Sequence, residues 1–139
     1  MISIIIPAYN EEKRLPEALN KTLIYLKKRK LKNEIIIVAD KSKDRTLEVV
    51  KDYSKRYRNI RYVYNPKKQG KGYAIKKGIL ASKGSLVLFT DADTSTPITE
   101  LDKFIPEIKN YDIVIGSREH KDSIVKEKLI SRVILGNLG

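Results

Sequence analysis

Asp91 and Asp93 stand one residue apart, directly after the apolar run at 85–90. Residues two apart in an extended segment point to the same side, so both carboxylates can converge on one cation. Oxygen ligands suit Mg²⁺ or Mn²⁺, and a site with few protein ligands leaves positions for the oxygens of a diphosphate. Aspartates also cap turns and helices, so the pair alone leaves a metal site and a turn equally open.

Polar side chains also follow three other strand-like runs of the chain. They are Tyr9 and Glu11, Asp40 and Asp44, and Ser117 and Arg118. In an open α/β sheet, ligands bind outside the carboxyl ends of the parallel strands, which meet at one edge. Four polar strand ends at one edge favour the metal and diphosphate interpretation of Asp91 and Asp93. Arg118 suits a diphosphate, because a guanidinium pairs with two phosphate oxygens.

Strand-like runs alternate with helical segments along the chain. We predict strands at 2–6, 34–40, 60–64, 85–90 and 112–116, and helices at 15–26, 47–57, 74–81, 98–108 and from about 122 on. We expect Asn10 to cap the first helix and Ser42 or Asp44 to cap the second. The alternation predicts an α/β fold with a mostly parallel sheet flanked by helices.

A basic loop with two glycines, at 65–72, precedes the third predicted helix. Its Gln69-Gly70-Lys71-Gly72 sequence would let backbone amides and Lys71 approach a phosphate, but it lacks the spacing of a P-loop. A flexible basic turn is an equal alternative. For His120, a solvated or structural role outweighs contact with a metal or phosphate.

The composition limits the possible partners and chemistry. Lys and Arg number 29 against 17 Asp and Glu, and the net charge of +12 favours nucleotides, nucleic acid or an acidic membrane surface as partners. The absence of cysteine excludes disulfides, thiolate zinc sites and cysteine nucleophiles. No secretory signal begins the chain, and no apolar run approaches the roughly 18 residues that span a bilayer. We expect one soluble or peripheral domain.

Three ordered motifs resemble those of family 2 glycosyltransferases with the GT-A fold. They are Ile4-Ile5-Ile6-Pro7-Ala8-Tyr9-Asn10-Glu11-Glu12, Val38-Ala39-Asp40-Lys41-Ser42-Lys43-Asp44-Arg45-Thr46 and Thr90-Asp91-Ala92-Asp93. Gly70-Lys71-Gly72, the aspartate motif and Gly116-Ser117-Arg118-Glu119-His120 are most similar to the branch that loads a sugar onto a polyprenyl phosphate, the dolichyl-phosphate glucosyltransferase and mannose synthase group.

The resemblance implies a Rossmann-like GT-A nucleotide-sugar-binding domain over residues 1–139. It implies inverting transfer of a hexose from UDP-glucose or GDP-mannose to a polyprenyl or dolichyl phosphate, with Mg²⁺ or Mn²⁺ as cofactor. The implied site residues are Pro7, Ala8, Tyr9, Glu11, Asp40 and Lys71 at the nucleotide, Asp91 and Asp93 at the metal, and Arg118 and Arg132 at phosphates, with Asp91, Asp93 and Arg118 catalytic.

Two departures from the family pattern affect these implications. The family commonly reads V-D-D-G-S where this chain has Val38-Ala39-Asp40-Lys41-Ser42, so the choice of nucleotide stays open. Family members also continue past this endpoint into acceptor-binding segments, so we expect the chain to be truncated at its C-terminal end.

The last predicted helix bears on the acceptor. Its apolar residues are Ile124, Val125, Leu129, Ile130, Val133, Ile134 and Leu138, and its basic residues are Lys126, Lys128 and Arg132. Such a helix suits the cytoplasmic face of a membrane, with ordinary packing on the sheet as an equal alternative. No clear general base for a hydroxyl acceptor is present, which favours an already ionised lipid phosphate.

Three other functions remain as alternatives. They are a truncated donor-binding domain without turnover, a family 2 glycosyltransferase that acts on a hydroxyl acceptor and, ranked well below, a basic RNA-binding domain. The RNA-binding reading is disfavoured because the aromatic strand motifs of common RNA modules are missing. A nucleic-acid partner is therefore not expected.

Overall fold

The computed structural model describes residues 1–116 of the chain. They fall into two compact units, one from Met1 to Glu100 and one that begins at Leu101. The predictions for Ser117, Arg118, His120 and Arg132, and for the last helix, concern residues outside the described part of the chain.

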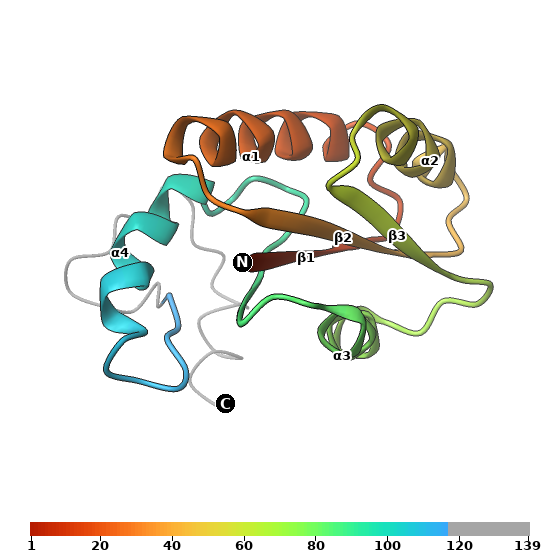
Figure 1. Ribbon diagram of the computed structural model, residues 1–139. Helices are drawn as coiled ribbons and strands as arrows, with labels where there is room; N and C mark the ends of the chain where they lie inside the picture. Colours follow the sequence, from red (N-terminus) through yellow and green to blue (C-terminus); the bar gives the residue numbers. More distant parts are fainter. Residues whose placement is uncertain (117–139) are drawn as a thin grey trace, which may run out of the picture. The chain divides into compact units, whose positions relative to one another are not determined.

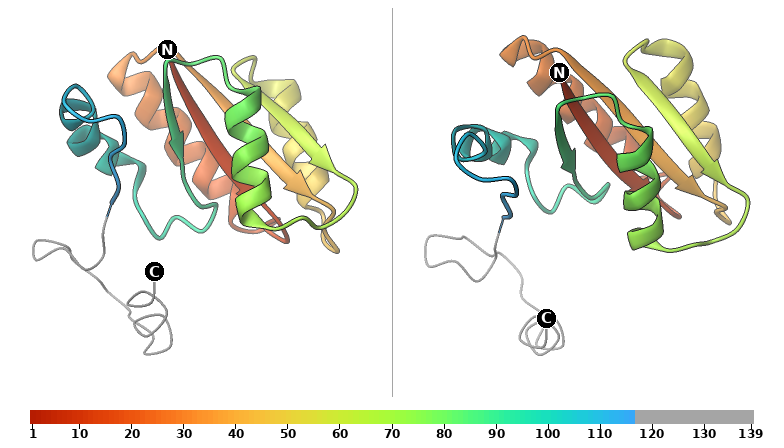
Figure 2. Two further views of the ribbon diagram at one scale, coloured as in Figure 1. Left: turned by 90° about the horizontal axis from the view of Figure 1, so that it is seen from below. Right: turned by 60° about the horizontal axis from the view of Figure 1, so that its bottom comes forward.

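The first unit is built on a four-stranded parallel sheet. Its strands are β1 (Ile2–Ala8), β2 (Asn33–Asp40), β3 (Ile60–Asn65) and β4 (Leu86–Phe89), in the order β3-β2-β1-β4. Figure 2 shows these strands side by side. All pairs are parallel, so the carboxyl ends of the four strands share one edge of the sheet. The predicted α/β class with a mostly parallel sheet is confirmed.

Helices cover both faces of this sheet. Helices α1 (Leu15–Arg29) and α2 (Thr46–Arg56) lie on one face, and α3 (Lys71–Ala81) lies on the other (Figure 1). A strand covered on both faces is apolar on both sides, which explains the unbroken runs of the two central strands. Ile4, Ile5 and Ile6 of β1 are fully buried, as are residues 35–39 of β2.

Small residues let α3 approach the sheet closely, as the sequence predicts. Ala74 is 2% exposed and belongs to a core cluster with Ile5, Ile36 and Val38. A Cβ atom placed on Gly78 would overlap the side chain of Ile5. Gly78 therefore sets the distance between α3 and β1.

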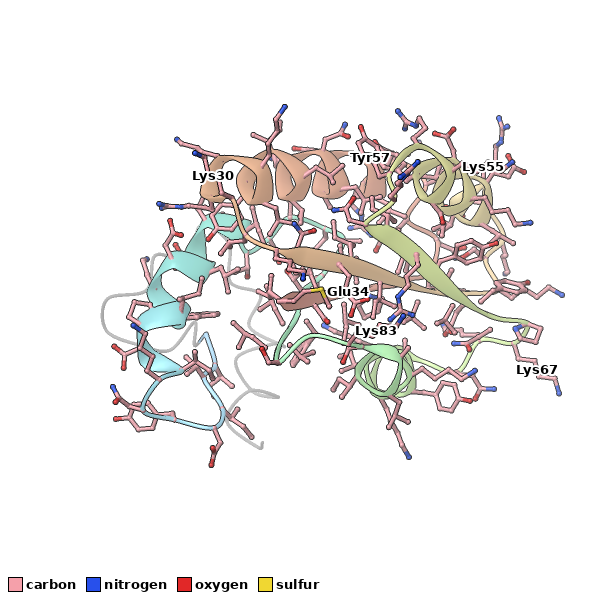
Figure 3. The ribbon with its side chains drawn as sticks, viewed as in Figure 1. Lys30, Glu34, Lys55, Tyr57, Lys67 and Lys83 are labelled. Carbon is pink, nitrogen blue, oxygen red and sulfur yellow. The ribbon has the colours of Figure 1, made fainter. Side chains whose placement is uncertain are left out.

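A buried carboxylate joins the amino-terminal end of the sheet to the end of α3. Glu34 accepts hydrogen bonds from the Ser3 hydroxyl at 2.5 Å, the Lys83 backbone N–H at 2.6 Å and Arg61 Nε at 3.0 Å. Glu34 and Lys83 are labelled in Figure 3. The Arg61 guanidinium also donates to the backbone carbonyl of Ala81. These hydrogen bonds fix the segment between the end of α3 and the start of β4 against the sheet.

The predicted cap of the first helix is wrong. Helix α1 begins at Leu15, and Asn10 lies before it in a left-handed backbone conformation with φ of 53°. The Asn10 side chain accepts the backbone N–H of Lys43 instead, so a contact between two loops replaces the local cap. At the second helix, Asp44 accepts the N–H of Thr46, the first helical residue, while Arg45 is the N-cap residue.

The strand predicted at 112–116 is also wrong. These residues form no strand, and Ile113 and Ile115 are 81% and 77% exposed. A strand needs a neighbour that pairs with its backbone N–H and C=O groups, and no described strand pairs with this segment. The helix predicted at 98–108 is present as two short helices. They are η1 (Ile98–Glu100) and α4 (Leu101–Glu107), and α4 ends directly after Pro106. No helix in residues 1–116 is long and apolar enough to cross a membrane.

Candidate functional site

A pocket of about 310 Å³ opens at the carboxyl edge of the sheet. It is lined by Pro7, Ala8, Tyr9, Glu11, Val38, Asp40, Lys68, Gly70, Lys71, Ala74, Asp91, Ala92 and Asp93. Every described residue that the sequence places at the nucleotide or the metal is among them. Asp44 is not, although the sequence places it at the same crevice.

The two aspartates lie just after β4. Ala92 between them is 2% exposed, whereas the Asp91 side chain is 45% exposed. Thr94 turns the chain with φ of 55°, and the N–H of Ser95 donates to Asp93 Oδ1 at 3.0 Å. Burial alone would raise the pKa of Asp93, but the N–H and hydroxyl of Ser95 and two nearby basic side chains hold it below its usual value. Asp93 is therefore a carboxylate near neutral pH.

The oxygens of Asp91 and Asp93 fit a hard divalent cation. Asp91 already presents an oxygen to a positive group, because Lys71 Nζ lies 2.6 Å from its Oδ1. Among the described residues, no set of three Asp, Glu or His side chains converges on a metal position. A cation held by two aspartates would take its other ligands from substrate or water, as expected for a diphosphate site.

Tyr9 and Glu11 come from the loop that follows β1. The ammonium of Lys68 lies 4.2 Å from the centre of the Tyr9 ring, in the geometry of a cation–π contact. Glu11 is held by Arg14, which donates from Nε at 2.7 Å and from Nη2 at 2.9 Å. The pocket wall on this side thus combines an aromatic ring with a fixed carboxylate.

Side chains of the loop after β2 and of the first residue of α2 hold the backbone of the loop after β1. The N–H groups of residues 10, 11 and 12 donate to Ser42 Oγ at 3.0 Å, Thr46 Oγ1 at 2.8 Å and Asp44 Oδ2 at 3.2 Å. In return, Glu12 accepts the N–H of Arg45. Burial would raise the pKa of Asp44, but its bonds to Thr46 and Glu12 lower it below the usual range. Ser42, Asp44 and Thr46 therefore position Tyr9 and Glu11 rather than line the pocket.

Asp40 lies on the pocket wall but is 4% exposed. Its Oδ1 accepts Asn65 Nδ2 at 2.7 Å, and its Oδ2 accepts the N–H groups of Gln69 and Gly70 at 2.9 and 3.0 Å. Asn65 and Lys68 are site residues that the sequence analysis did not single out. The only sequence signal for Asn65 is its position directly after the strand predicted at 60–64.

Curated relatives with matching sequences are named as dolichyl-phosphate sugar transferases. The chain is 44% identical over 146 residues to dolichyl-phosphate beta-glucosyltransferase ALG5A of Trichomonas vaginalis, covering 97% of this chain and 45% of that protein. It is 34% identical to human dolichyl-phosphate beta-glucosyltransferase, covering 96% and 46%. It is 35% identical to dolichol-phosphate mannosyltransferase of Pyrococcus furiosus, covering 94% and 38%. The chain spans less than half the length of these relatives.

Solved structures show the same architecture. Mannosyltransferase PcManGT from Pyrobaculum calidifontis, in complex with GDP-Man and Mn²⁺, matches with a TM-score of 0.57 and 25% identity, over 66% of this chain and 27% of that one. S. aureus TarS 1–349 in complex with UDP-GlcNAc matches with a TM-score of 0.61 and 25% identity, over 87% and 38%. Residues 3–133 match the family described as glycosyl transferase family 2. The chain therefore belongs to glycosyl transferase family 2 and has the GT-A fold, as its motifs predict.

Proposed function

We propose that this chain is the nucleotide-sugar-binding part of an inverting hexosyltransferase. The donor is UDP-glucose or GDP-mannose, and the acceptor is dolichyl phosphate or another polyprenyl phosphate. The observation that carries the proposal is that Asp91, Asp93 and Lys71 line the same pocket as Tyr9 and Glu11. Relatives named for transfer to dolichyl phosphate, at 34–44% identity, support the acceptor class.

The diphosphate and the nucleoside of the proposed donor lie against different walls of the pocket. Asp91 and Asp93 would hold Mg²⁺ or Mn²⁺ at the diphosphate, and Lys71 contributes a second positive charge. The PcManGT complex with GDP-Man and Mn²⁺ supports a nucleotide-sugar and a divalent cation as the ligands. The nucleoside lies against the other wall, which is formed by Pro7, Ala8, Tyr9, Glu11 and Asp40. Arg118 and Arg132 are proposed to contact phosphates, on the resemblance alone.

The reaction is a single displacement at the anomeric carbon. A phosphate oxygen of the acceptor attacks this carbon, and the bond to the donor's diphosphate breaks with its electron pair leaving on the diphosphate oxygen. The bound cation would neutralise charge on that leaving group. Lys71, with an ammonium already beside Asp91, stabilises the same charge as it develops. An ionised phosphate acceptor requires no protein base.

We also propose that residues 1–139 form one catalytic domain, that the protein is peripheral at the cytoplasmic face of a membrane, and that Arg118 is catalytic. The net charge of +12 supports attraction to an anionic lipid surface.

A donor-binding domain without turnover is the second candidate, because the chain covers less than half of each named relative. A transfer assay separates the two. The chain is incubated with Mn²⁺, a labelled donor and a short polyprenyl phosphate, and the lipid product is extracted and counted. Labelled lipid that disappears with Asp91→Asn supports catalysis. Donor binding without labelled lipid would support the binding-only alternative, and transfer to hydroxyl acceptors alone would contradict the lipid-phosphate acceptor.

A further inference from the structure

A chain of polar contacts runs from the middle of α3 back to the loop that precedes it. Asp40 and Asn65 are the last residues of β2 and β3, are register partners, and are only 4% and 2% exposed. Lys77 is two turns into α3, and its Nζ donates to Asn65 Oδ1 at 3.0 Å. None of these contacts is needed for the sheet pairing itself, because each involves a side chain.

The charges on both sides fix the orientation of the Asn65 amide. A carboxylate only accepts hydrogen bonds and an ammonium only donates them. The amide NH₂ must therefore face Asp40, at 2.7 Å, and the amide oxygen must face Lys77. The opposite orientation would set the amide NH₂ against an ammonium and its oxygen against a carboxylate. Lys77 thus fixes the orientation of the Asn65 amide, and Asn65 in turn holds Oδ1 of Asp40.

The other oxygen of Asp40 holds the loop at 66–70. It accepts the backbone N–H groups of both Gln69 and Gly70. Gly70 has φ of 90°, a conformation that favours glycine, and it is the residue before the first turn of α3. The contacts therefore run from Lys77 through Asn65 and Asp40 to Gly70, the residue directly before α3.

Two lysines that face the pocket lie in this loop or directly after it. Lys68 lies over the Tyr9 ring, and Lys71 directly follows the Gly70 turn and reaches Asp91. A shift of the turn would move both ammonium groups relative to the nucleotide. Lys77 itself does not line the pocket.

We infer that Lys77 and Asn65 are positioning residues of the donor site: acting through Asp40, they fix the loop at 66–70 so that Lys68 and Lys71 face the nucleoside diphosphate. The inference rests on the proposed function for its ligand. The inference that Lys77 and Asn65 order the loop at 66–70 does not depend on the proposed function.

The test compares Lys77→Met with Lys76→Met, which removes the same charge from the neighbouring, exposed residue of α3. Amide hydrogen exchange of the ligand-free chain is measured by NMR at Gln69 and Gly70, with amides of β2 as the reference for global opening. We expect exchange at the two loop amides to accelerate about tenfold in Lys77→Met, and to stay unchanged in Lys76→Met, because one network hydrogen bond is lost. Lys77→Arg, which can still donate to Asn65, restores protection.

Calorimetry with UDP and with GDP, each with Mn²⁺, gives the second readout. We expect Lys77→Met to weaken binding of the nucleoside diphosphate about three- to tenfold, with Lys76→Met like the wild type. Unprotected Gln69 and Gly70 amides in the wild type, or equal effects of the two lysine variants, would overturn the inference. If the wild-type chain bound neither nucleotide, the proposed function would fail, and the exchange rates would still decide whether the network orders the loop.

Discussion

The ammonium of Lys71 lies 2.6 Å from Oδ1 of Asp91 and joins the start of α3 to the chain that follows β4. The two side chains are 56% and 45% exposed, so the pair is open to solvent and to ligand. An exposed ion pair of this kind contributes only ~0.2–1 kcal/mol. Lys71 can therefore leave Asp91 at little cost when a metal and a diphosphate arrive.

Lys71→Met tests this exchange. Without the ammonium, Asp91 has no competing cation, so we expect Mn²⁺ alone to bind up to about fivefold more tightly, the upper limit for an exposed pair. Donor binding should weaken, because a positive charge at the diphosphate is lost. Titration of Mn²⁺ followed by electron paramagnetic resonance measures the first effect. Lys67→Met removes an exposed lysine of the loop before α3 and serves as the control. Unchanged Mn²⁺ affinity in Lys71→Met would contradict the competition.

Thr46→Val tests the contact between the start of α2 and the loop after β1. Thr46 is fully buried and accepts the N–H of Glu11 at 2.8 Å, so the nearly isosteric valine leaves that N–H without its partner. We expect a loss of about 1–3 kcal/mol in the free energy of unfolding, measured in urea, together with weaker donor binding. Thr22→Val in α1 removes a hydroxyl that bonds only the Ala18 carbonyl among the contacts described, and it should leave donor affinity unchanged. Equal donor affinity in Thr46→Val and the wild type would show that the contact does not shape the pocket.

The lowered pKa of Glu34 should make the free energy of unfolding depend on pH. Burial would raise its pKa, but bonds from Ser3, the Lys83 N–H and Arg61 lower the pKa below its ordinary value of 4.5. A depressed pKa in the folded state stabilises the protein above the unfolded-state pKa, and this contribution is lost as the pH falls through the folded-state pKa. We expect the free energy of unfolding to decline below about pH 4.5.

Urea unfolding between pH 3 and pH 7 measures this decline. Glu34→Gln should be less stable than the wild type at pH 7 and should show a shallower decline below pH 4.5. Glu17→Gln changes an exposed carboxylate of α1 and should keep the slope of the wild type. An unchanged slope in Glu34→Gln would mean that other carboxylates, such as Asp44 and Asp93, dominate the acid sensitivity.

Gly78→Ala tests the close packing of α3 on β1. The added methyl group would overlap the Ile5 side chain, and we expect a destabilisation of about 1–3 kcal/mol from overpacking. Gly72→Ala in the same helix is the matched control, since its Cβ would meet nothing within 4 Å. Alanine is the better helix former there, so Gly72→Ala should raise stability slightly. Similar unfolding midpoints for the two variants would contradict the packing account.

The sequence predicts the parts of the fold that depend on local patterns. Unbroken β-branched runs identify the buried strands β1 and β2, and small residues at helical spacing identify the buried face of α3. Five pocket residues are predicted from the ends of strands, because parallel strands share one carboxyl edge; they are Tyr9, Glu11, Asp40, Asp91 and Asp93. Pro7 and Ala8 are expected only from the family resemblance.

The features that sequence reasoning missed depend on contacts between distant residues. Asn10 has the residue type of a helix cap, but its partner is Lys43 in another loop. Asn65 and Lys77 are brought into contact by the tertiary structure, and no local sequence pattern predicts that contact. The run at 112–116 has the composition of a buried strand, but composition alone does not supply a neighbouring strand.

Asp91 and Asp93 are proposed to bind a metal at the diphosphate of a nucleotide-sugar. Calorimetric titration of UDP-glucose and GDP-mannose into the chain, with Mn²⁺ and with a chelator, tests it most directly. Asp93→Asn is compared with Asp52→Asn, which changes an exposed aspartate of α2 outside the pocket. We expect at least one donor to bind more tightly with Mn²⁺, Asp93→Asn to abolish the difference, and Asp52→Asn to retain it. Equal donor affinity with metal and with chelator in the wild type would contradict the claim.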